Sequence, residues 1–375
     1  MDPQTHDLIT ALRHRLHSHP ERSGEEKWTK ATLIDFLQTH TQLEVVDCGA
    51  WAYAVYHSPS PTREAIAFRA DFDALPIADG RSDLPYQSVC PNLSHACGHD
   101  GHAAALCGLA LYLEATGADR DVYLIFQHAE EIGAGGQACA AFLETVPVHH
   151  VYAMHNMSGF PEGAVIVRDG LSQCASEGVT FHFQGARCHA SQPEDGRNPA
   201  LAIAALITAS ERLIKETTWP GLVLATVVGA RIGQGDFGIA AGEGQLSLTL
   251  RAEEESALKQ LEALLAAEAE RQAETWKLEW QMDRCDIFPE TRNDPATAAI
   301  VREAAAALGL KTLEPETPWR ASEDFGWYTR VCPGAIFYIG NGLDHAPLHT
   351  PDYDFNDRIL STIVAMFGKI IQITP

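Results

Sequence analysis

The chain has 375 residues, of which 46% are hydrophobic and 21% are charged, and this composition is ordinary for a globular protein. Its 27 Lys and Arg residues stand against 50 Asp and Glu residues, a formal charge of −23. This balance argues against nucleic acid or an anionic membrane surface as a partner, because both need clustered basic side chains. No apolar run has the length of a signal peptide core or a membrane span, and the 9 cysteines contain no CxxC pair. We therefore expect a cytoplasmic protein of about two domains.

The first third of the sequence alternates apolar runs with a helical pattern. Residues 65–68, 122–126 and 151–154 are short apolar runs, typical of buried strands. Between the first two runs, leucine and alanine recur at helical spacing over residues 103–113. Strands that alternate with helices predict an α/β fold, with a mostly parallel sheet and helices on both faces.

Polar side chains follow each of these predicted strands. Asp71 and Asp73 follow the first strand, and Glu130 and Glu131 follow the second. His155 follows the third. The carboxyl ends of parallel strands form the sheet edge at which ligands bind in α/β proteins. The pattern therefore predicts a functional site at this edge.

The pattern of apolar and polar residues changes between residues 172 and 285. Residues 178–183, 222–232 and 244–253 resemble strands. One helix is predicted to begin at Asn198 and Pro199, and a second carries leucines 258, 261 and 265 on one face. After residue 285 the helix and strand patterns of the first part return. We expect a catalytic domain made of residues 1–171 and 286–375, interrupted by a smaller α+β domain at residues 172–285.

The segment SHACGHDGHAA, residues 94–104, has the residue types of a metal site. Cys97 and His99 can place a thiolate and an imidazole on one ion, but two ligands make no stable site. Glu131, His155 and His349 have the right chemistry to complete the site. One thiolate, three imidazoles and one carboxylate are too many for a tetrahedral zinc with an open position. They suit two ions with Cys97 as the bridge.

Neighbouring acidic residues have predicted roles of their own. Glu130 and Glu131 are adjacent, so one can bind metal while Glu130 stays free as general base. Asp73 can accept a hydrogen bond from a ligating histidine and fix its tautomer. Asp100 is expected to be the N-cap of a helix that starts at Gly101.

Two other interpretations of this region stay open. Cys97 could be a nucleophile with His99 or His102 as its base, although this leaves the glutamate pair and two distant histidines without a role. A non-catalytic binding protein could also retain all of these residues. Cys107 is expected to lie in the core. We expect five further histidines not to be ligands: His95, His102, His128, His149 and His150.

A series of motifs resembles a known family. In chain order they are RADFDALPI, HACGHDGHAA, FQHAEE, MHN, GARCHASQP, SEDF and LHTPDYDF, and the resemblance spans about residues 12–355. They resemble the amidohydrolase group that includes aminoacylases, hippurate hydrolase and indoleacetyl-amino-acid hydrolases, a branch of the dimetal exopeptidase superfamily. The resemblance implies a zinc-peptidase-like α/β domain interrupted by a lid, in which two helices pack on a four-stranded ferredoxin-like sheet.

The resemblance also implies a reaction. The substrate would be an N-acyl amino acid, cleaved to a carboxylate and a free amine, with small peptides of a carboxypeptidase or dipeptidase as the alternative. Glu130 would be the general base, and His189 would help to hold the developing oxyanion when the lid closes. A homodimer is compatible with the sequence. The ligands of two divalent ions, zinc, manganese or cobalt, would be Cys97, His99, Glu131, His155 and His349.

Further positions are candidates for substrate contacts. Arg251 and Asn198 could receive the substrate carboxylate, and Glu323 of the SEDF motif could support the site. The chain departs from the family pattern at His128, where proline is common. It also has Arg187 and Cys188 in place of a glycine pair before His189.

Overall fold

The computed structural model describes all 375 residues, which form two compact units. Unit 1 comprises residues 1–172, 291–318 and 323–375, and unit 2 comprises residues 173–290 and 319–322. Each unit has its own sheet and its own hydrophobic core. None of the helices combines the length and the apolar character needed to cross a lipid bilayer.

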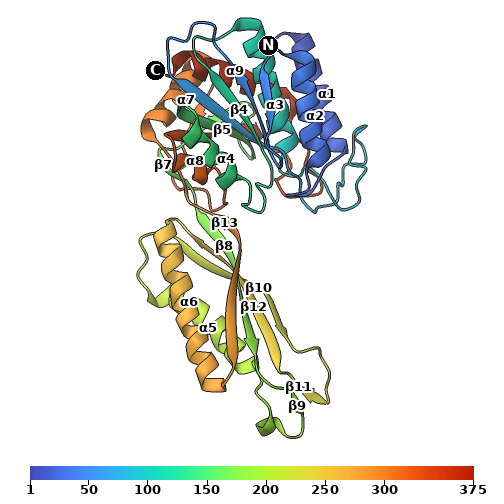
Figure 1. Cartoon of the computed structure of the whole chain (residues 1–375), viewed down its shortest axis with the longest axis vertical. Helices are drawn as coiled ribbons and strands as arrows, with labels where there is room; N and C mark the ends of the chain where they lie inside the picture. Colours follow the sequence, from blue (N-terminus) through green and yellow to red (C-terminus); the bar gives the residue numbers. More distant parts are fainter. The chain divides into compact units, whose positions relative to one another are not determined.

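Unit 1 is built on an eight-stranded mixed sheet with the order β1-β2-β4-β3-β5-β16-β6-β15 (Figure 1). Its strands are β1 (Glu44–Asp47), β2 (Ala52–Tyr56), β3 (Ala65–Asp71), β4 (Val122–Gln127), β5 (Val148–Ser158), β6 (Val165–Ile166), β15 (Thr312–Leu313) and β16 (Gly334–Gly342). The four central strands β4, β3, β5 and β16 are parallel to one another, whereas β1 and β2 are antiparallel at one side. The predicted α/β fold with a largely parallel sheet is confirmed. A separate two-stranded sheet pairs β7 (Gly170–Gln173) with β14 (Thr291–Asn293).

Helices cover both faces of this sheet. Five helices share one core with alternate residues of the central strands, among them Phe68, Phe126 and Phe337, because successive strand side chains point to opposite faces. They are α1 (Pro3–Ser18), α2 (Lys27–His40), α3 (His99–Thr116), α7 (Pro295–Ala307) and α9 (Leu360–Ile373). The short helices α4 (Gly136–Phe142) and α8 (Gly326–Thr329) pack together on the other face (Figure 1).

Helix α3 begins earlier than the sequence predicts. Its N-cap is Gly98, whose φ of 93° turns the chain into the helix one residue before His99. Asp100 therefore lies in the first turn, and the prediction that it is the N-cap is wrong. Its buried carboxylate instead lies 2.8 Å from Nδ1 of His17 and 3.6 Å from Nη1 of Arg13. These partners come from α1 and could not be read from the local sequence.

Unit 2 has the predicted ferredoxin-like architecture. Two helices pack on one face of a four-stranded antiparallel sheet with the order β10-β12-β8-β13. The elements are β8 (Ala175–Gln184), β9 (Cys188–His189), α5 (Ala200–Glu216), β10 (Val223–Ile232), β11 (Ile239–Ala240), β12 (Glu243–Ala252), α6 (Glu255–Trp276) and β13 (Glu279–Phe288). Helix α5 begins at Ala200 instead of Pro199, and Asn198 Oδ1 accepts a hydrogen bond from the Ala200 N–H at 2.9 Å.

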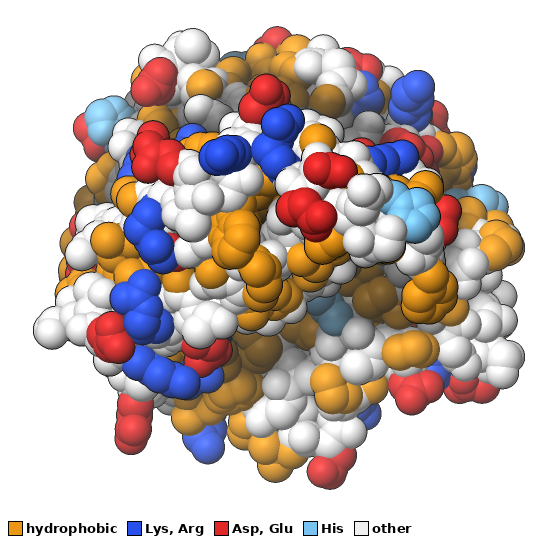
Figure 2. All heavy atoms as spheres, turned by 90° about the horizontal axis from the view of Figure 1, so that it is seen from below, with side chains coloured by type: hydrophobic (Ala, Val, Ile, Leu, Met, Phe, Trp, Pro, Cys, Tyr) orange, Lys and Arg blue, Asp and Glu red, His pale blue; other side chains and the backbone are white.

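The surface mixes charged and apolar side chains. Figure 2 shows Lys, Arg, Asp and Glu interspersed with hydrophobic side chains over one face of the molecule. In unit 2, β10 is an edge strand, so its outer backbone groups have no strand partner. Exposed apolar side chains gather on β10 and the segment after it: Val227, Val228, Ile232, Phe237 and Ile239.

Candidate metal centre

The candidate site forms where the four parallel strands of unit 1 end. Asp73 follows β3, and the Glu130–Glu131 pair follows β4. His155 lies near the end of β5, and His349 lies in the loop after β16. Because the strands run parallel, their carboxyl ends meet at one edge and bring these distant residues together.

Cys97 lies at the centre of this group. Its Sγ lies 3.4 Å from Nε2 of His155 and 3.3 Å from Nε2 of His349. The five residues form two overlapping sets, and within each set the potential ligand atoms lie within 4.8 Å of one another. One set is Cys97, His99 and His155, and the other is Cys97, Glu131 and His349. Cys97 is common to both.

Asp73 orients two members of the site at once. Its Oδ1 lies 3.0 Å from Nδ1 of His99, while its Oδ2 accepts the backbone N–H of Glu131 at 3.0 Å. The opposite ring nitrogen of His99, Nε2, is thereby directed towards Oε1 of Glu131 at 3.8 Å. A ligating histidine held in this way by a carboxylate is typical of metal sites.

Two buried polar atoms at this position have no hydrogen-bond partner within the protein. They are Nε2 of His99 and Oε1 of Glu131. A buried polar atom left unpaired costs about 1–3 kcal/mol, so an atom of this kind is expected to face a water molecule, an ion or another ligand. Thiolate, imidazole and carboxylate together are donors that suit zinc and related divalent ions. The residues present therefore fit a pair of divalent cations.

Burial and charge shift the pKa values of the sulfur and imidazole groups. Burial, followed by the charges of Glu131 and Glu130, raises the pKa of the Cys97 thiol well above its usual value. Burial also lowers the pKa of His155. For His99, burial alone would lower the pKa, but nearby carboxylates, first that of Asp71, raise it to about 10. The site thus concentrates negative charge around a sulfur that a cation would stabilise as thiolate.

Glu130 also lies beside two further buried carboxylates. Its carboxylate oxygen lies within 4.8 Å of those of Glu323 and Asp324, and its Oε1 accepts the Asp324 backbone N–H at 3.4 Å. Burial, then the charges of Glu323 and Asp324, raise the pKa of Glu130 well above its usual value. Arg69 partly balances these acids, with Nη2 at 3.0 Å from Glu323 and 2.6 Å from Asp324.

Sequence reasoning missed this buried network. Arg69 is 2% exposed and also binds Asp71 at 2.6 Å. The available signal was an arginine inside the apolar strand AIAFRAD, because a buried guanidinium needs carboxylate partners. Glu323, in contrast, was singled out from the sequence and lies beside Glu130 in this network.

Three candidate residues belong to unit 2. His189 is exposed in β9, and its Nδ1 lies 2.7 Å from Oγ of Ser191. Arg251 donates two hydrogen bonds from Nη1, to the Arg320 carbonyl at 2.5 Å and to Ser322 Oγ at 2.8 Å. Asn198 contacts the start of α5, as described above.

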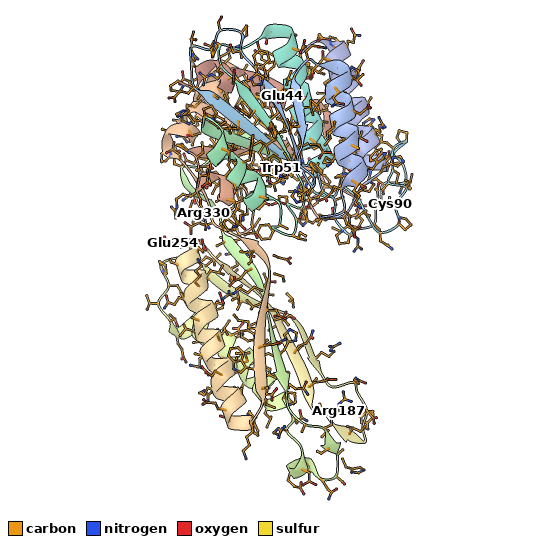
Figure 3. The ribbon with its side chains drawn as sticks, in the orientation of Figure 1. Glu44, Trp51, Cys90, Arg187, Glu254 and Arg330 are labelled. Carbon is orange, nitrogen blue, oxygen red and sulfur yellow. The ribbon has the colours of Figure 1, made fainter.

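The Arg187–Cys188 pair, which replaces a glycine pair, is accommodated by ordinary backbone angles. Neither residue has a positive φ. The exposed Arg187 side chain, labelled in Figure 3, donates a hydrogen bond to Glu243 at 2.7 Å. Cys188 pairs with Ala240 of β11. Glycine is therefore not required at these two positions.

The remaining histidines near the site have other contacts. His102 binds Asp71 through Nδ1 at 2.6 Å, and its Nε2 accepts the Asn156 backbone N–H. Neither His102 nor His99 makes a hydrogen bond to Cys97, whose nearest imidazoles are those of His155 and His349. Cys107, which lies in α3, is fully buried in the hydrophobic core of unit 1, as predicted.

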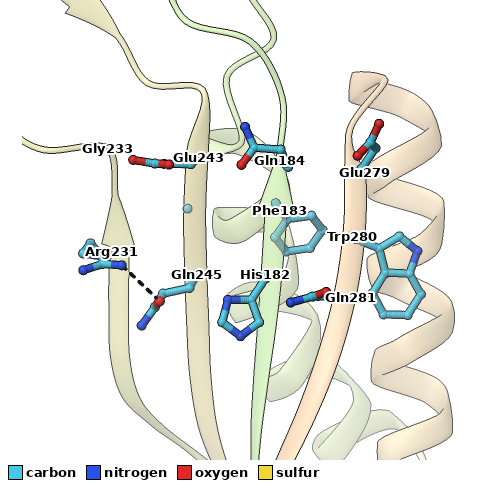
Figure 4. A pocket seen from close by; sticks show the side chains of 11 residues that line it. His182, Phe183, Gln184, Arg231, Gly233, Glu243, Gln245, Glu279, Trp280 and Gln281 are labelled. Atoms are coloured by element: carbon cyan, nitrogen blue, oxygen red, sulfur yellow. Dashed lines mark hydrogen bonds between the residues drawn. The ribbon is translucent and has the colours of Figure 1, made fainter.

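A groove of about 410 Å³ lies on the open face of the unit 2 sheet (Figure 4). Its lining is polar, and one hydrogen bond of 3.3 Å joins Arg231 to Gln245 across neighbouring strands. Its charged side chains, such as Glu243 and Glu279, are partly or fully exposed. The groove therefore lacks the buried, convergent groups that distinguish the edge of the unit 1 sheet.

Similar proteins are known. An N-acetyl-L-cysteine deacetylase of Bacillus subtilis is 28% identical over 94% of this chain and 84% of its own length. A hippurate hydrolase of Campylobacter jejuni is 27% identical over 96% of this chain and 94% of its own length. The crystal structure of the Bacillus subtilis YXEP protein, described as a dinuclear metal binding peptidase, superimposes with a TM-score of 0.82 at 24% identity, covering 99% of this chain and 98% of that one. The model of peptidase family M20/M25/M40 matches residues 67–373, and this chain therefore belongs to that family of amide-bond hydrolases.

Proposed function

We propose that this protein is a metal-dependent amidohydrolase that cleaves N-acyl amino acids to a carboxylate and a free amine. The observation that carries the proposal is the pair of ligand sets that share Cys97 at the strand ends. The names of the relatives, an N-acetyl-L-cysteine deacetylase and a hippurate hydrolase, support an acylated amino acid as the substrate class.

The proposed metal ligands are the five residues of the two sets. Cys97 would bridge the ions, and the orphaned atoms of His99 and Glu131 would gain their missing partners. Zinc, manganese and cobalt are the candidate metals, since thiolate and imidazole favour zinc and the carboxylate admits the other two. When bound, two such ions supply the Lewis-acid chemistry of a two-metal hydrolase site.

Glu130 is the proposed general base. It would take a proton from the attacking water and then deliver that proton to the leaving amine. Both steps need a carboxyl group that can hold a proton near neutral pH. The neighbouring acids Glu323 and Asp324 favour this, because they raise the pKa of Glu130 in the same direction as its burial does.

His189 is the proposed donor to the developing oxyanion. Its Nδ1 accepts the backbone N–H of Ser191 at 3.2 Å. An imidazole whose Nδ1 accepts a hydrogen bond carries its proton on Nε2 when it is neutral. His189 would therefore present Nε2–H as a donor without needing to be charged, as an oxyanion-stabilising group requires.

Arg251 is the proposed contact for the substrate carboxylate. Both of its hydrogen bonds to Arg320 and Ser322 come from Nη1, so Nε and Nη2 stay available. No acidic side chain of unit 2 forms an ion pair with it, and burial lowers its pKa because no carboxylate compensates. A guanidinium in this condition suits a carboxylate ligand. Asn198 is the second candidate for this contact: its Oδ1 accepts the Ala200 N–H, and its Nδ2 would be the donor to the carboxylate.

Amine release from a panel of substrates tests the proposed function. The panel would contain N-acetyl, N-benzoyl and N-indoleacetyl amino acids together with unblocked dipeptides, with and without a chelator. Glu130→Gln should keep its metal while hydrolysis falls by about 10²- to 10⁴-fold. Glu177→Gln, which changes a buried glutamate of unit 2, is the matched control and should retain turnover.

The possible results separate the alternatives. If Glu130→Gln retained turnover, Glu130 would not be the general base. Preference for unblocked dipeptides would favour a dipeptidase. No chelator-sensitive amine release from any substrate would favour a binding protein. The homodimer stays a prediction from the sequence.

A further inference from the structure

Asn156 occupies a buried position between the segments that carry the proposed ligands. It follows His155 in β5 and has no exposed surface. Its Nδ2 donates to the backbone carbonyl of Cys97 at 2.7 Å. Its Oδ1 accepts from Nδ2 of Asn341 at 3.0 Å and from the hydroxyl of Tyr353. One side-chain amide thus joins β5, the loop before α3, β16 and the loop that follows His349.

The backbone of Asn156 orders the neighbouring imidazoles. Its carbonyl lies 2.6 Å from Nδ1 of His155 and accepts the proton there, which leaves Nε2 of His155 facing Cys97. Its N–H donates to Nε2 of His102 at 3.2 Å. His102 in turn donates from Nδ1 to Asp71 at 2.6 Å, so its tautomer is fixed at both nitrogens.

The loop that carries Cys97 is held from two sides. The His349 N–H donates to the carbonyl of Ala96 at 2.8 Å, and the Asn156 amide donates to the next carbonyl, that of Cys97. Gly98, which follows, has a φ of 93°, and a Cβ placed there would lie 2.7 Å from both Asn156 Oδ1 and the Tyr353 hydroxyl. The amide and the Tyr353 hydroxyl therefore occupy the space that a side chain at position 98 would need.

We propose that Asn156 is a positioning residue of the metal centre, which sets the place of the Cys97 sulfur relative to His155 and His349. This inference rests on the proposed function, because it assumes that these residues bind cations. Asn156 itself would not be a ligand: its side-chain atoms are already committed to Cys97, Asn341 and Tyr353. Hydrogen bonds that orient ligands in this way affect metal affinity strongly.

The test is cobalt binding to the metal-free protein, followed by the thiolate-to-cobalt absorption band. Asn156→Asp keeps the side-chain size and the Oδ1 acceptor but replaces Nδ2, which donates to the Cys97 carbonyl and lies 3.0 Å from Nε2 of His102, by an oxygen. We expect cobalt affinity to fall by about 10- to 100-fold, with a weaker thiolate band. The control is Asn293→Asp, since Asn293 is equally buried and its Nδ2 donates to the carbonyls of Ile336 and Arg168 at 2.9 Å. It contacts none of the five proposed ligands, so its cobalt affinity should match wild type.

A milder variant keeps the proposal testable if Asn156→Asp does not fold. Tyr353→Phe removes only the hydroxyl that donates to Asn156 Oδ1, and it should weaken cobalt binding by about fivefold. Wild-type affinity in a folded Asn156→Asp protein, or a loss no larger than that of Asn293→Asp, would overturn the proposal. If Asn156→Asp is unfolded, unchanged affinity in Tyr353→Phe would overturn it.

The same titration separates this inference from the proposed function. If wild-type protein shows no thiolate band, or if Cys97→Ala retains it, the metal centre is wrong and both proposals fall. If wild type binds cobalt through Cys97 and Asn156→Asp binds it equally well, only the role of Asn156 is refuted.

Discussion

Asp73 and His99 are joined by a 3.0 Å contact between Oδ1 and Nδ1 in the interior of unit 1. The second oxygen of Asp73 accepts the Glu131 backbone N–H and the Ser23 hydroxyl, at 3.0 and 2.7 Å. The Asp73 carboxylate therefore fixes both the imidazole of His99 and the backbone of Glu131, which are two of the proposed ligands. Neither of those two groups can rotate away from the site without breaking a buried hydrogen bond.

Replacing this carboxylate by an amide should weaken metal binding. In Asp73→Asn the amide can still bond His99, but it no longer stabilises the Nδ1–H tautomer with a negative charge. We expect metal affinity to fall by about 10- to 100-fold, measured by competition with a chromogenic chelator. Unchanged affinity would show that Asp73 only supports the fold.

Removing the shared sulfur should reduce the number of bound ions. Cys97 belongs to both ligand sets, so Cys97→Ala leaves each set with two protein ligands. Elemental analysis should then find fewer metal ions per chain than in wild type. Cys107→Ala changes another buried cysteine, in the core, and should leave the metal content unchanged. Two ions retained in Cys97→Ala would contradict the bridging role.

The His17–Asp100 pair predicts a pH dependence of stability. Burial alone would lower the pKa of His17, but the nearby carboxylates of Asp100 and Asp79 raise it from 6.5 to about 9. Between pH 6.5 and about 9, His17 holds a proton in the folded state that it has lost in the unfolded state. The free energy of unfolding therefore falls as pH rises through this range and levels off above it. The full loss is on the order of 3 kcal/mol.

Denaturant unfolding of wild type and His17→Gln at several pH values measures this effect. The variant has no group that titrates at this position, so its stability should lack the decline. An equal decline in both proteins would assign the pH dependence to other groups.

Arg251 should affect substrate binding more than the chemical step. Arg251→Gln removes the charge but keeps a polar side chain with an amide donor at this position. For an N-acyl amino acid we expect KM to rise by about 10-fold or more with a smaller change in kcat, since a charged hydrogen bond is lost in ground state and transition state alike. Arg231→Gln, on the open face of the same sheet, is the control. If Arg251→Gln had the same KM as wild type, Arg251 would not be the contact for the substrate carboxylate.

Much of the fold was predictable because it depends on local pattern. Apolar runs correctly predicted the strands β3, β4 and β5. Each strand nevertheless extends beyond its apolar run into polar residues such as Asp71 and Gln127. Those polar ends are buried by partners elsewhere in the chain, and hydropathy alone cannot reveal them. The start of α3 was misplaced for the same reason, since Asp100 bonds to α1 instead of capping its own helix.

The sequence by itself determined which residue types were available for chemistry and that parallel strand ends would bring acids and a histidine to one edge. The resemblance of the ordered motifs to a known family then implied the metal ligands, the general base and the reaction. Only the tertiary structure decided the distances around Cys97, the orphaned atoms of His99 and Glu131, and the networks centred on Arg69 and Asn156. The physical reason is that buried hydrogen bonds and ion pairs join residues far apart in the chain, and their geometry exists only once the strands and helices have packed.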